Sequence, residues 1–458
     1  MTDLAVSIGA GERPKIAPQA VPGAALTYHV WTIGCQMNQA DSRRTAAALE
    51  GLGFRAVDRP EDADLVILNS CVVRQSAEDK VTGRLHSLRP LKSRRPGMAV
   101  VLMGCLVGDV QALRERFPHV DLFLRPSDVE GLLGWVSSRM ANDLRPCAFS
   151  SQPAGEEPLA AGTAGAPVPV SVGVTAMMGC DRHCTYCIVR LRRGPGRSRP
   201  PEEIVAEAEA LVRSGAREIV LLGQNIDAYG RDLPERPSLA SLLRKVHEIP
   251  GLLRLRFLTS HPADLEDEVI DTVAALPKVC PHFELPVQAG DDRILRRMGR
   301  GHRATDYIAL VERIRSRVPG ASLATDIIVG FPGETAEEFE RTLDLLRTVR
   351  FDAVHVACYS VRPGTPAARL PDDVPQEEKE RRRRAVEALQ EQIVGEINAR
   401  LLGQEVEVLV EEMHKGKWKG RSPTNKLVFF EHPGDWRGRL VKVRISRAGP
   451  WSLQGEVP

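Results

Sequence analysis

The chain has little net charge and no long apolar run, and both shortages exclude a class of protein. Of its 458 residues, 62 are Lys or Arg and 60 are Asp or Glu, so the formal charge is only +2. Any contact with nucleic acid must therefore come from a local basic patch. No uncharged apolar stretch approaches the ~20 residues that cross a bilayer, and no charged segment followed by an apolar one opens the sequence. We therefore expect a cytoplasmic protein without a signal peptide.

Aromatic residues are also scarce, at 5%, whereas cysteine occurs nine times. A cytosolic protein with this many cysteines uses them more often as ligands or catalysts than in disulfides. Hydrophobic residues make up 43% of the chain, which is enough to bury the cores of roughly three domains of about 150 residues each. The positions of the cysteines within those domains are therefore the most informative feature of the sequence.

Three similar units follow a tail, residues 1–25, which we expect to be disordered. In each unit a cysteine stands at the end of an apolar stretch. The apolar stretches HVWTIGC, LVILNSC and AVVLMGC end at Cys35, Cys71 and Cys105, and a helical stretch follows each of them. Alternating strands and helices predict an α/β domain with a parallel sheet over residues 26–145. Parallel strands end at one edge of a sheet, where ligands usually bind. We therefore expect the three thiols to converge on a shared ligand site, although any one of them alone is more typical of a buried core thiol.

The rest of the chain divides into a linker (residues 146–167), a second α/β segment and a β-rich end. Residues 168–401 contain six strand-like runs separated by helical patterns, which predicts a partial (β/α) barrel two units short of the closed eight-fold form. Residues 402–458 contain four or five short alternating stretches separated by Gly and Pro, as in a small β-barrel. The charged run EEKERRRR begins the last long helix, and we expect it to be a solvated helix face.

The most specific pattern is GCDRHCTYC, which spaces Cys180, Cys184 and Cys187 as C-x3-C-x2-C. Iron–sulfur clusters normally take four cysteines. No fourth cysteine is nearby, so one iron would stay open for a small ligand. Zinc is the alternative, but structural zinc sites use four closed ligands, usually in C-x2-C pairs, and His183 would strain the loop as the fourth. The spacing therefore favours an iron–sulfur cluster with a free coordination position.

This pattern resembles the radical S-adenosylmethionine superfamily, and the whole chain after the tail resembles its methylthiotransferases, of the MiaB type that modifies tRNA. The resemblance includes TIGCQMNQADS, LNSCVVRQSAEDKV, MGCDRHCTYC, LLGQNIDAYG, ELPVQAGDD and TDIIVGFPGET. The end of the chain, with WKGRSPTNKLVFF and SLQGE, resembles a TRAM domain, which is an RNA-binding module. The expected fold is thus an N-terminal parallel α/β sheet domain, a six-unit partial barrel of the radical S-adenosylmethionine type and a C-terminal TRAM β-barrel.

The resemblance implies two [4Fe-4S] clusters and S-adenosyl-L-methionine as cofactors. The residues Cys180, Cys184 and Cys187 would hold the radical-generating cluster, and an auxiliary cluster that delivers sulfur would be held by Cys35, Cys71 and Cys105. The implied reaction adds a methylthio group to carbon 2 of isopentenyladenosine next to the tRNA anticodon, through a 5′-deoxyadenosyl radical. The implied partners are the anticodon stem-loop of tRNA and an electron donor such as flavodoxin or ferredoxin, and nothing demands more than a monomer.

Two other functions remain possible on the sequence. A sister methylthiotransferase would act on threonylcarbamoyladenosine in tRNA or on an aspartate of a ribosomal protein, although the QMN that follows Cys35 favours the isopentenyladenosine branch. A protein of another class would bind RNA and metal without catalysis.

Five residues near strand ends of the barrel are candidates for cofactor contacts. Gly223, Gln224 and Asn225 follow the second strand, where the resemblance implies contact with the methionine part of the cofactor. A glycine allows close backbone approach, and the two carboxamides could bond an amino group. Gln288 and Asp326 lie near the ends of the fourth and fifth strands, where barrel active sites lie. The alternative for each residue is a structural turn or hydrogen bond.

A basic run in the C-terminal segment is the candidate RNA contact. Lys415, Lys417, Lys419 and Arg421 surround Trp418, and cations interleaved with an aromatic ring suit phosphates and a stacked base. A solvated hairpin is the alternative.

Residues just after the cluster cysteines bear on the substrate. The arginines there could guide an RNA backbone or be plain surface charge; they are Arg190, Arg192, Arg193, Arg197 and Arg199. The chain also departs from the family here, because Val189, Arg190 and Leu191 replace the usual Val-Pro-Tyr. Another departure is VQAGDD in place of VQSGSD. Neither touches a cluster ligand, so the departures bear on the substrate or cofactor face.

Overall fold

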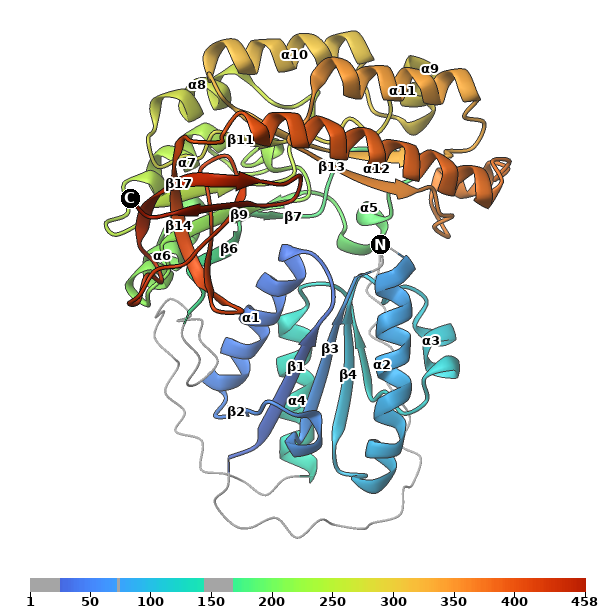
Figure 1. Ribbon diagram of the computed structural model, residues 1–458. Helices are drawn as coiled ribbons and strands as arrows, with labels where there is room; N and C mark the ends of the chain where they lie inside the picture. The colour runs from blue at the N-terminus through green and yellow to red at the C-terminus, as the bar shows by residue number, and fades with distance from the viewer. Residues whose placement is uncertain (1–24, 72–74, 144–167) are drawn as a thin grey trace.

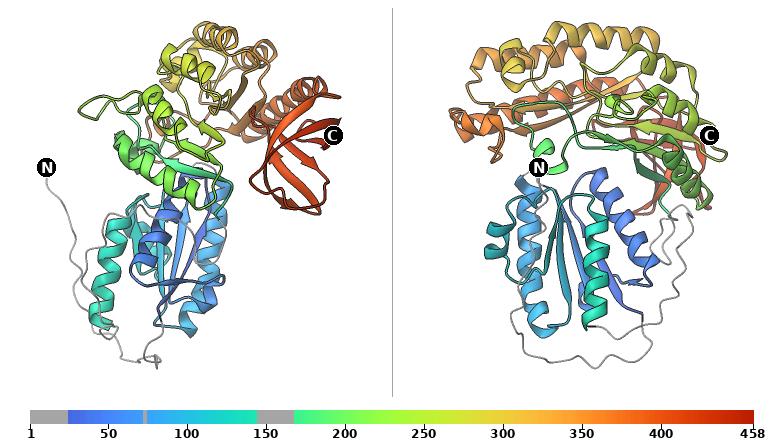
Figure 2. Two further views of the ribbon diagram at one scale, coloured as in Figure 1. Left: turned by 90° about the vertical axis from the view of Figure 1, so that its left-hand side faces the viewer. Right: turned by 180° about the vertical axis from the view of Figure 1, so that it is seen from behind.

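The computed structural model describes residues 25–71, 75–143 and 168–458 and arranges them in three parts (Figures 1 and 2). In Figure 1 the N-terminal sheet lies below the partial barrel, and the C-terminal strands lie beside the barrel. The expected tail up to residue 24, the expected linker and Cys147 lie outside the described residues. No helix in these described ranges is long and apolar enough to cross a membrane.

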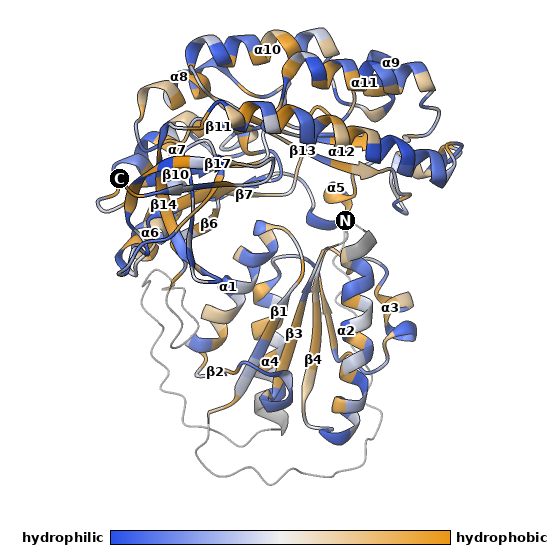
Figure 3. Cartoon of the chain, in the orientation of Figure 1, coloured by the Kyte–Doolittle hydropathy of each residue, from blue (hydrophilic) through white to orange (hydrophobic). Residues whose placement is uncertain are grey.

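The first part is a five-stranded parallel sheet with the strand order β2-β1-β3-β4-β5. Its elements are β1 (Thr27–Thr32), α1 (Gln36–Gly51), β2 (Arg55–Ala56), β3 (Leu65–Ser70), α2 (Gln75–Arg94), β4 (Ala99–Gly104), α3 (Val110–Arg116), β5 (Leu122–Leu124) and α4 (Val129–Asp143). The central strands β3 and β4 are buried along their whole length, because helices cover both faces of the sheet. Figure 3 shows these strands as apolar ribbons between helices with polar outer faces. The three predicted strand–helix units are confirmed.

The second part is a half barrel whose inner strands are surrounded by helices. Its elements up to the third barrel strand are β6 (Ser171–Thr175), β7 (Met177–Met178), α5 (Val189–Arg193), β8 (Arg197–Ser198), α6 (Pro201–Arg213), β9 (Glu218–Leu222), α7 (Leu239–His247) and β10 (Arg254–Phe257). The remaining elements are α8 (Asp267–Ala275), β11 (His282–Glu284), α9 (Asp292–Met298), α10 (Ala304–Arg317), β12 (Ser322–Val329), α11 (Ala336–Val349), β13 (Ala353–Cys358) and α12 (Gln376–Ala399).

The six barrel strands form two parallel sheets, β6-β9-β10 and β11-β12-β13, joined by a bridge between Leu255 and Val279. Within the described residues β6 and β13 are the outer edges and do not pair, so the predicted six-unit partial barrel is confirmed. The main apolar core lies between the strands and the outer helices, and a smaller apolar cluster packs against Tyr186 of the cysteine loop.

The N-terminal part closes one side of the open barrel. Met37 and Ala40 of α1 pack against Val220 and Leu222 on the inner face of β9, and the Arg43 guanidinium donates to a carbonyl oxygen of β6. The inner face of a half barrel cannot fill itself with side chains from the missing strands. Helix α1 therefore supplies part of the packing that two further barrel units would give.

The third part is a closed five-stranded barrel with the order β14-β15-β16-β18-β17. Its strands are β14 (Glu405–His414), β15 (Lys417–Arg421), β16 (Leu427–Phe430), β17 (Leu440–Ala448) and β18 (Leu453–Glu456). It docks on the half barrel through β10, where the buried Arg256 pairs with Glu218 (2.7 Å) and donates to the carbonyl oxygens of Ser422 (2.7 Å) and Pro423 (2.8 Å). The small barrel therefore has a fixed position relative to the large one.

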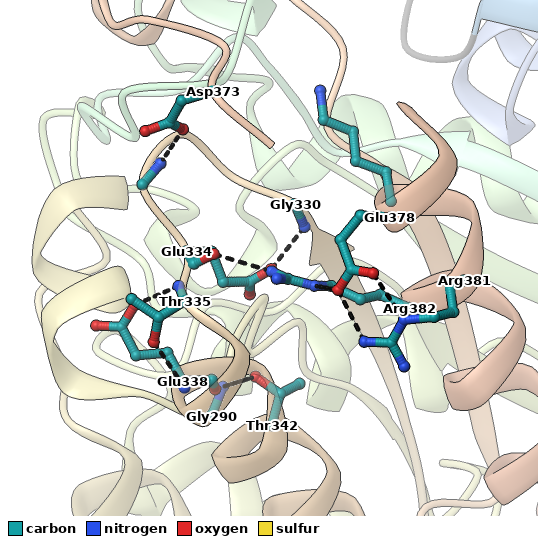
Figure 4. Close-up of polar contacts among 12 residues, drawn as sticks. Gly290, Gly330, Glu334, Thr335, Glu338, Thr342, Asp373, Glu378, Arg381 and Arg382 are labelled. Atoms are coloured by element: carbon teal, nitrogen blue, oxygen red, sulfur yellow. Dashed lines mark hydrogen bonds and ion pairs between the residues drawn. The ribbon is translucent and has the colours of Figure 1, made fainter. Parts of the chain in front are cut away.

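The charged run at the start of α12 is not the solvated face that the sequence predicted. Lys379 and Arg382 are buried, at 2% and 4% exposure. Arg382 pairs with the side chain of Glu334 (2.8 Å) and donates to its carbonyl oxygen (3.0 Å), while the Gly330 N–H donates to the same carboxylate (2.6 Å) (Figure 4). The prediction of a uniformly solvated run is wrong, because residues three apart lie on the same face of a helix, and Lys379 and Arg382 share a buried face. The loop after β12 and the start of α12 are thus joined by a buried ion pair, while Arg381 stays exposed.

Candidate functional site

The loop that carries Cys180, Cys184 and Cys187 begins at the C-terminal end of the first barrel strand. β7 and β8 pair as a short antiparallel ribbon at the base of the loop. Gly179 has a φ of +76°, and a Cβ there would lie 2.0 Å from the carbonyl oxygen of Pro195, so only glycine fits. The Thr185 N–H donates to the carbonyl oxygen of Met298 (2.8 Å), which ties the loop to the end of α9.

The three thiols of this loop lie close enough to influence one another. Burial, with smaller contributions from Cys184 and Cys180, raises the pKa of Cys187 to about 12. Two N–H groups point at the sulfur atoms, since the Arg182 amide lies 3.4 Å from the Cys180 Sγ and the Arg300 Nη1 lies 3.4 Å from the Cys184 Sγ. Donors of this kind stabilise cluster-bound thiolates. The arrangement fits an iron–sulfur cluster.

The spacing of possible ligands also bears on the zinc alternative. A zinc ion needs four ligands at about 2.0–2.3 Å. The cluster loop offers three thiols, and the fourth candidate, the His183 Nε2, lies 2.8 Å from the Arg190 Nη1. This donor set suits a cluster with one open iron better than a closed zinc site.

An open pocket of about 440 Å³ lies beside the cluster loop. It is lined by Asp181, Arg182, His183, Asn225, Ala228, Arg231 and Gly299. Among the described residues the buried Asn225 Oδ1 has no hydrogen-bond partner, while its Nδ2 donates to Asp264 (2.8 Å). Although burial opposes ionisation, hydrogen bonds from Arg182, Arg231 and Asn225 hold the pKa of Asp264 well below its usual range. A fixed anion thus orients two arginines and one carboxamide around the pocket.

Of the predicted cofactor contacts, Gln288 and Asp326 are brought together on the inner side of the barrel. The Gln288 N–H donates to the Asp326 carbonyl oxygen (3.0 Å), and Gln288 has a left-handed φ of +81°, which is uncommon outside glycine and concentrates at functional sites. Its buried Oε1 has no hydrogen-bond partner in the described part of the chain. The neighbouring Glu284 is half-buried, and burial followed by the Asp326 charge raises its pKa to about 7. Two acids and an unpaired carboxamide oxygen therefore face the barrel interior.

Gly223 and Gln224 have structural partners instead. A Cβ at position 223 would lie 2.7 Å from the Met177 Cγ, so this glycine lets β7 pack closely. The Gln224 Oε1 accepts a hydrogen bond from the Gly179 N–H (2.5 Å). Both residues hold the base of the cluster loop, and Asn225 is the member of the trio that lines the pocket. The contacts of all five residues with a cofactor remain predictions.

Two further residues lie at the cluster loop, and sequence reasoning missed the first of them. Arg300 is buried and contacts Cys184 from outside the cysteine motif. His261, for which sequence reasoning left the choice between ligand contact and structural hydrogen bond open, is also buried, and burial together with the charges of Arg300 and Arg182 lowers its pKa to about 2. The glycines on either side of Arg300, both with φ near +70°, are the signal that marked a turn at this place.

The second set of cysteines lies at the C-terminal edge of the N-terminal sheet, as the parallel topology predicted. Cys35 caps the start of α1, and Cys71 and Cys105 directly follow β3 and β4. Burial raises the pKa of Cys105 to about 11, the Arg193 cation opposes this rise, and Cys71 and Cys35 add to it. A Cβ on Gly34 would lie 2.9 Å from the Cys71 Cβ. The three thiols therefore converge and fit a ligand set for a second cluster.

Arg193 joins the two sets of cysteines. It ends α5, the helix that begins two residues after Cys187, and it reaches into the N-terminal part. Its Nη2 pairs with Asp41 (3.0 Å), with the two side chains 4% and 1% exposed, and its Nη1 donates to Ser127 Oγ (3.2 Å). The cation also acts on Cys105. The expectation that this arginine contacts RNA or is plain surface charge is therefore wrong, because docking of the two parts buries it.

The basic run of the C-terminal barrel is arranged differently from the prediction. Trp418 is 6% exposed, packs in the barrel core, and donates from Nε1 to the carbonyl oxygen of His432 (3.2 Å). It cannot stack on a base, so that part of the prediction is wrong. Neighbouring cations have acidic partners on the barrel surface, in the pairs Lys417–Glu431 (3.0 Å), Lys419–Glu412 (2.5 Å) and Arg421–Glu411 (3.4 Å), and Lys415 lies exposed at the hairpin turn.

Family models match all three parts of the chain. The radical SAM superfamily matches residues 174–346, an uncharacterized protein family termed UPF0004 matches residues 27–125, and the TRAM domain matches residues 399–457.

Three relatives share about half of their residues with this chain, and each is named tRNA-2-methylthio-N(6)-dimethylallyladenosine synthase. The relative from Roseiflexus sp. (strain RS-1) is 51% identical over 93% of this chain and 89% of its own length. The relative from Chloroflexus aurantiacus is 50% identical over 93% and 91%, and that from Herpetosiphon aurantiacus is 48% identical over 94% and 97%.

A solved structure shares the fold. The radical S-adenosylmethionine methyltransferase TsrM from Kitasatospora setae, with cobalamin and a [4Fe-4S] cluster bound, aligns with a TM-score of 0.56 and 15% identity. The alignment covers 75% of this chain and 77% of TsrM. At this identity the likeness concerns the fold alone.

Proposed function

The chain belongs to the family of tRNA-2-methylthio-N(6)-dimethylallyladenosine synthases, and on that premise we propose how its own residues carry out methylthiolation. The enzyme is a radical S-adenosylmethionine methylthiotransferase, and its substrate is the adenosine of tRNA that carries a dimethylallyl group on N6. The observation that carries the proposal is the position of α5, which starts at the cluster loop and ends among the second set of cysteines. The two sets therefore serve one reaction.

The first set, Cys180, Cys184 and Cys187, would hold the radical cluster. A [4Fe-4S] cluster with S-adenosylmethionine supplies the single-electron cleavage and the hydrogen-abstracting radical, which no protein side chain can supply. The chain supplies positive charge and N–H groups to the thiolates, through Arg300 and the Arg182 amide. These donors favour the deprotonated sulfur that binds iron.

The pocket beside the loop would receive S-adenosylmethionine. The unpaired carboxamide oxygen of Asn225, which lines this pocket, suits the protonated amino group of the cofactor, because a buried acceptor without a donor is costly. The unpaired Gln288 Oε1, outside the pocket lining, would be a second acceptor on the inner side of the barrel. Asp326 would add a negative charge on the same side of the barrel. Asp264 holds Arg182 and Arg231 in place, and these cations suit the cofactor carboxylate.

The second set, Cys35, Cys71 and Cys105, would hold the auxiliary cluster that supplies sulfur for the methylthio group. The Arg193 cation contacts this set from α5 and opposes the effect of burial on Cys105. It would favour bound thiolates there and fix the distance between the two sites. Holding both groups and one base together in a protected space converts separate encounters into a single ordered reaction.

The TRAM barrel would contact the anticodon stem-loop. Its contact surface would consist of Lys415 and the solvent-accessible parts of the paired cations Lys417, Lys419 and Arg421. Fixed docking of this barrel on β10 would give the bound RNA a defined position relative to the cluster loop. We place the enzyme in the cytoplasm, where tRNA and a flavodoxin or ferredoxin donor are available, and expect it to act as a monomer.

Nucleoside analysis of tRNA tests this function. A strain lacking the gene should lose 2-methylthio-dimethylallyladenosine and accumulate dimethylallyladenosine, and the wild-type gene should restore the methylthio form. A Cys184→Ala gene should fail to restore it, while Cys280→Ala, which changes a buried thiol outside both sets, should succeed. An unchanged nucleoside profile in the deletion strain, or loss of methylthio from threonylcarbamoyladenosine alone, would contradict the proposal.

A further inference from the structure

Two exposed apolar side chains lie apart from all the others in the part of the chain that the structure describes. Six large hydrophobic residues are exposed there. Four of them belong to residues 402–451, in or beside the small barrel, and the remaining two are Leu191 and Val361, at 50% and 43% exposure. Exposed apolar groups grouped at one place on a surface mark contact sites more often than those scattered singly.

Leu191 lies between the two sets of cysteines. It is four residues after Cys187 and two residues before Arg193, on the short helix α5. Figure 1 shows this helix between the half barrel and the N-terminal sheet. A substrate atom that must reach both sets of cysteines has to come close to α5, so Leu191 lies beside the path of the reacting base.

Val361 belongs to the segment that Leu191 touches. A Cβ on Gly364 would lie 3.2 Å from the Leu191 Cδ1, and a hydrogen bond from the Thr365 N–H to the Arg362 carbonyl oxygen (3.1 Å) closes the turn that directly follows Val361 and contains Gly364. The same segment is bonded to the cluster loop, since the Ala367 N–H donates to the carbonyl oxygen of Thr185 (2.9 Å). Leu191 and the segment that carries Val361 therefore lie at the edge of the cluster loop.

The segment is also fixed to the N-terminal part of the molecule. The mostly buried Arg362, next to Val361, lies 3.6 Å from the carboxylate of Glu78 on α2. An apolar surface held by hydrogen bonds and an ion pair on both sides is pre-formed, which lowers the entropic cost of binding a ligand there.

We propose that Leu191 and Val361 form the contact surface for the dimethylallyl group of the substrate adenosine. The inference rests on the proposed function, because it takes the prenylated base as the occupant. The dimethylallyl group is branched, uncharged and of five carbons. The exposed Leu191 and Val361 side chains are apolar like this group, whereas the arginines beside Leu191 on α5 are charged. These two residues would determine selectivity for the prenylated adenosine.

The test compares two anticodon stem-loop RNAs that differ only in the dimethylallyl group on the reacting adenosine. Anaerobically reconstituted enzyme binds each RNA in a fluorescence anisotropy titration, and the ratio of the two Kd values reports the prenyl contact. A partly buried group of this size gives the wild type a preference of about tenfold or more. Leu191→Asn and Val361→Asn each lower the ratio to about threefold or less, while affinity for the unprenylated RNA stays within about threefold.

Leu402→Asn is the matched control, because Leu402 is as exposed as Leu191, at 50%, but lies in the turn that follows α12. It should keep the wild-type ratio. A wild type that binds both RNAs equally, or Leu191→Asn and Val361→Asn variants that both keep the wild-type ratio, would overturn the inference. Conversion of the prenylated RNA by the wild type is measured separately, so failure of the proposed function shows as absent methylthiolation, and failure of this contact alone shows as an unchanged ratio with normal conversion.

Discussion

The ion pair between Arg193 and Asp41 offers the sharpest test of how the two sets of cysteines are held together. Both side chains are buried, and the pair crosses from α5 to α1 at 3.0 Å. In the Arg193→Met variant, Asp41 still accepts the hydrogen bond from the Ser127 hydroxyl (2.6 Å), but its ion pair with residue 193 is lost. Leaving one member of a buried pair uncompensated costs about 3–5 kcal/mol, which corresponds to a 100-fold or greater rise in the opening equilibrium, at about 1.4 kcal/mol per tenfold.

Hydrogen–deuterium exchange of the apo protein measures this opening. Amides of α1, Gln36–Gly51, should exchange about 100-fold faster in Arg193→Met than in the wild type. Arg190→Met is the control, because Arg190 lies on the same helix but is exposed and bonds only within its own loop, to Asp181 and His183. Its α1 exchange should stay within about fivefold of the wild type, since exposed contacts contribute about 0–1 kcal/mol. Exchange in Arg193→Met within that same range would refute the proposed coupling of the two parts.

Three further results follow from the contacts. Arg382→Met should lower the free energy of unfolding in urea by about 3–5 kcal/mol, whereas the exposed Arg381→Met should lower it by under about 1 kcal/mol. Equal losses would contradict a stabilising role of the buried ion pair between Arg382 and Glu334. The Glu284 carboxyl, with its pKa raised from 4.5 to about 7, stays protonated in the folded chain after the unfolded chain has ionised, so wild-type stability should fall by up to about 2 kcal/mol as pH rises between these values. Glu284→Gln should reduce that slope in pH-dependent melts without abolishing it, because burial also raises the pKa of Asp227 to about 7; an unchanged slope would contradict the role of Glu284. Cys71→Ala should bind about four irons instead of about eight and still form 5′-deoxyadenosine, whereas Cys184→Ala should form none; equal yields would refute the division of roles.

Much of the site could be predicted because parallel topology makes strand ends converge. Cys35, Cys71 and Cys105 follow strands that pair as neighbours, so their approach needs no knowledge of other parts of the fold. The same reasoning placed Gln288 and Asp326 near strand ends, and in the structure the Gln288 N–H donates to the Asp326 carbonyl oxygen. Local spacing and strand order were therefore sufficient wherever one domain alone builds the site.

Residues whose role depends on docking between parts could not be predicted in this way. The environment of Arg193 is set by α1 from another domain, and the contact of Arg300 with Cys184 joins residues 116 positions apart. The glycines beside Arg300 mark a turn, but no local signal in the sequence indicates the partner of either arginine. The error at Trp418 has a different cause. Side chains alternate along β15, so the Trp418 ring lies on the opposite face from Lys417 and Lys419. The prediction relied on the composition of the run and did not apply this period of two.

The most direct test of the whole account is the metal and product analysis of protein purified and reconstituted without oxygen. The account predicts about eight irons per chain as two four-iron clusters. It also predicts formation of 5′-deoxyadenosine and of the methylthio nucleoside when S-adenosylmethionine, a reductant and dimethylallyl-bearing RNA are present. Zinc at Cys180, Cys184 and Cys187 with no iron, or intact clusters that leave the prenylated adenosine unchanged, would contradict it.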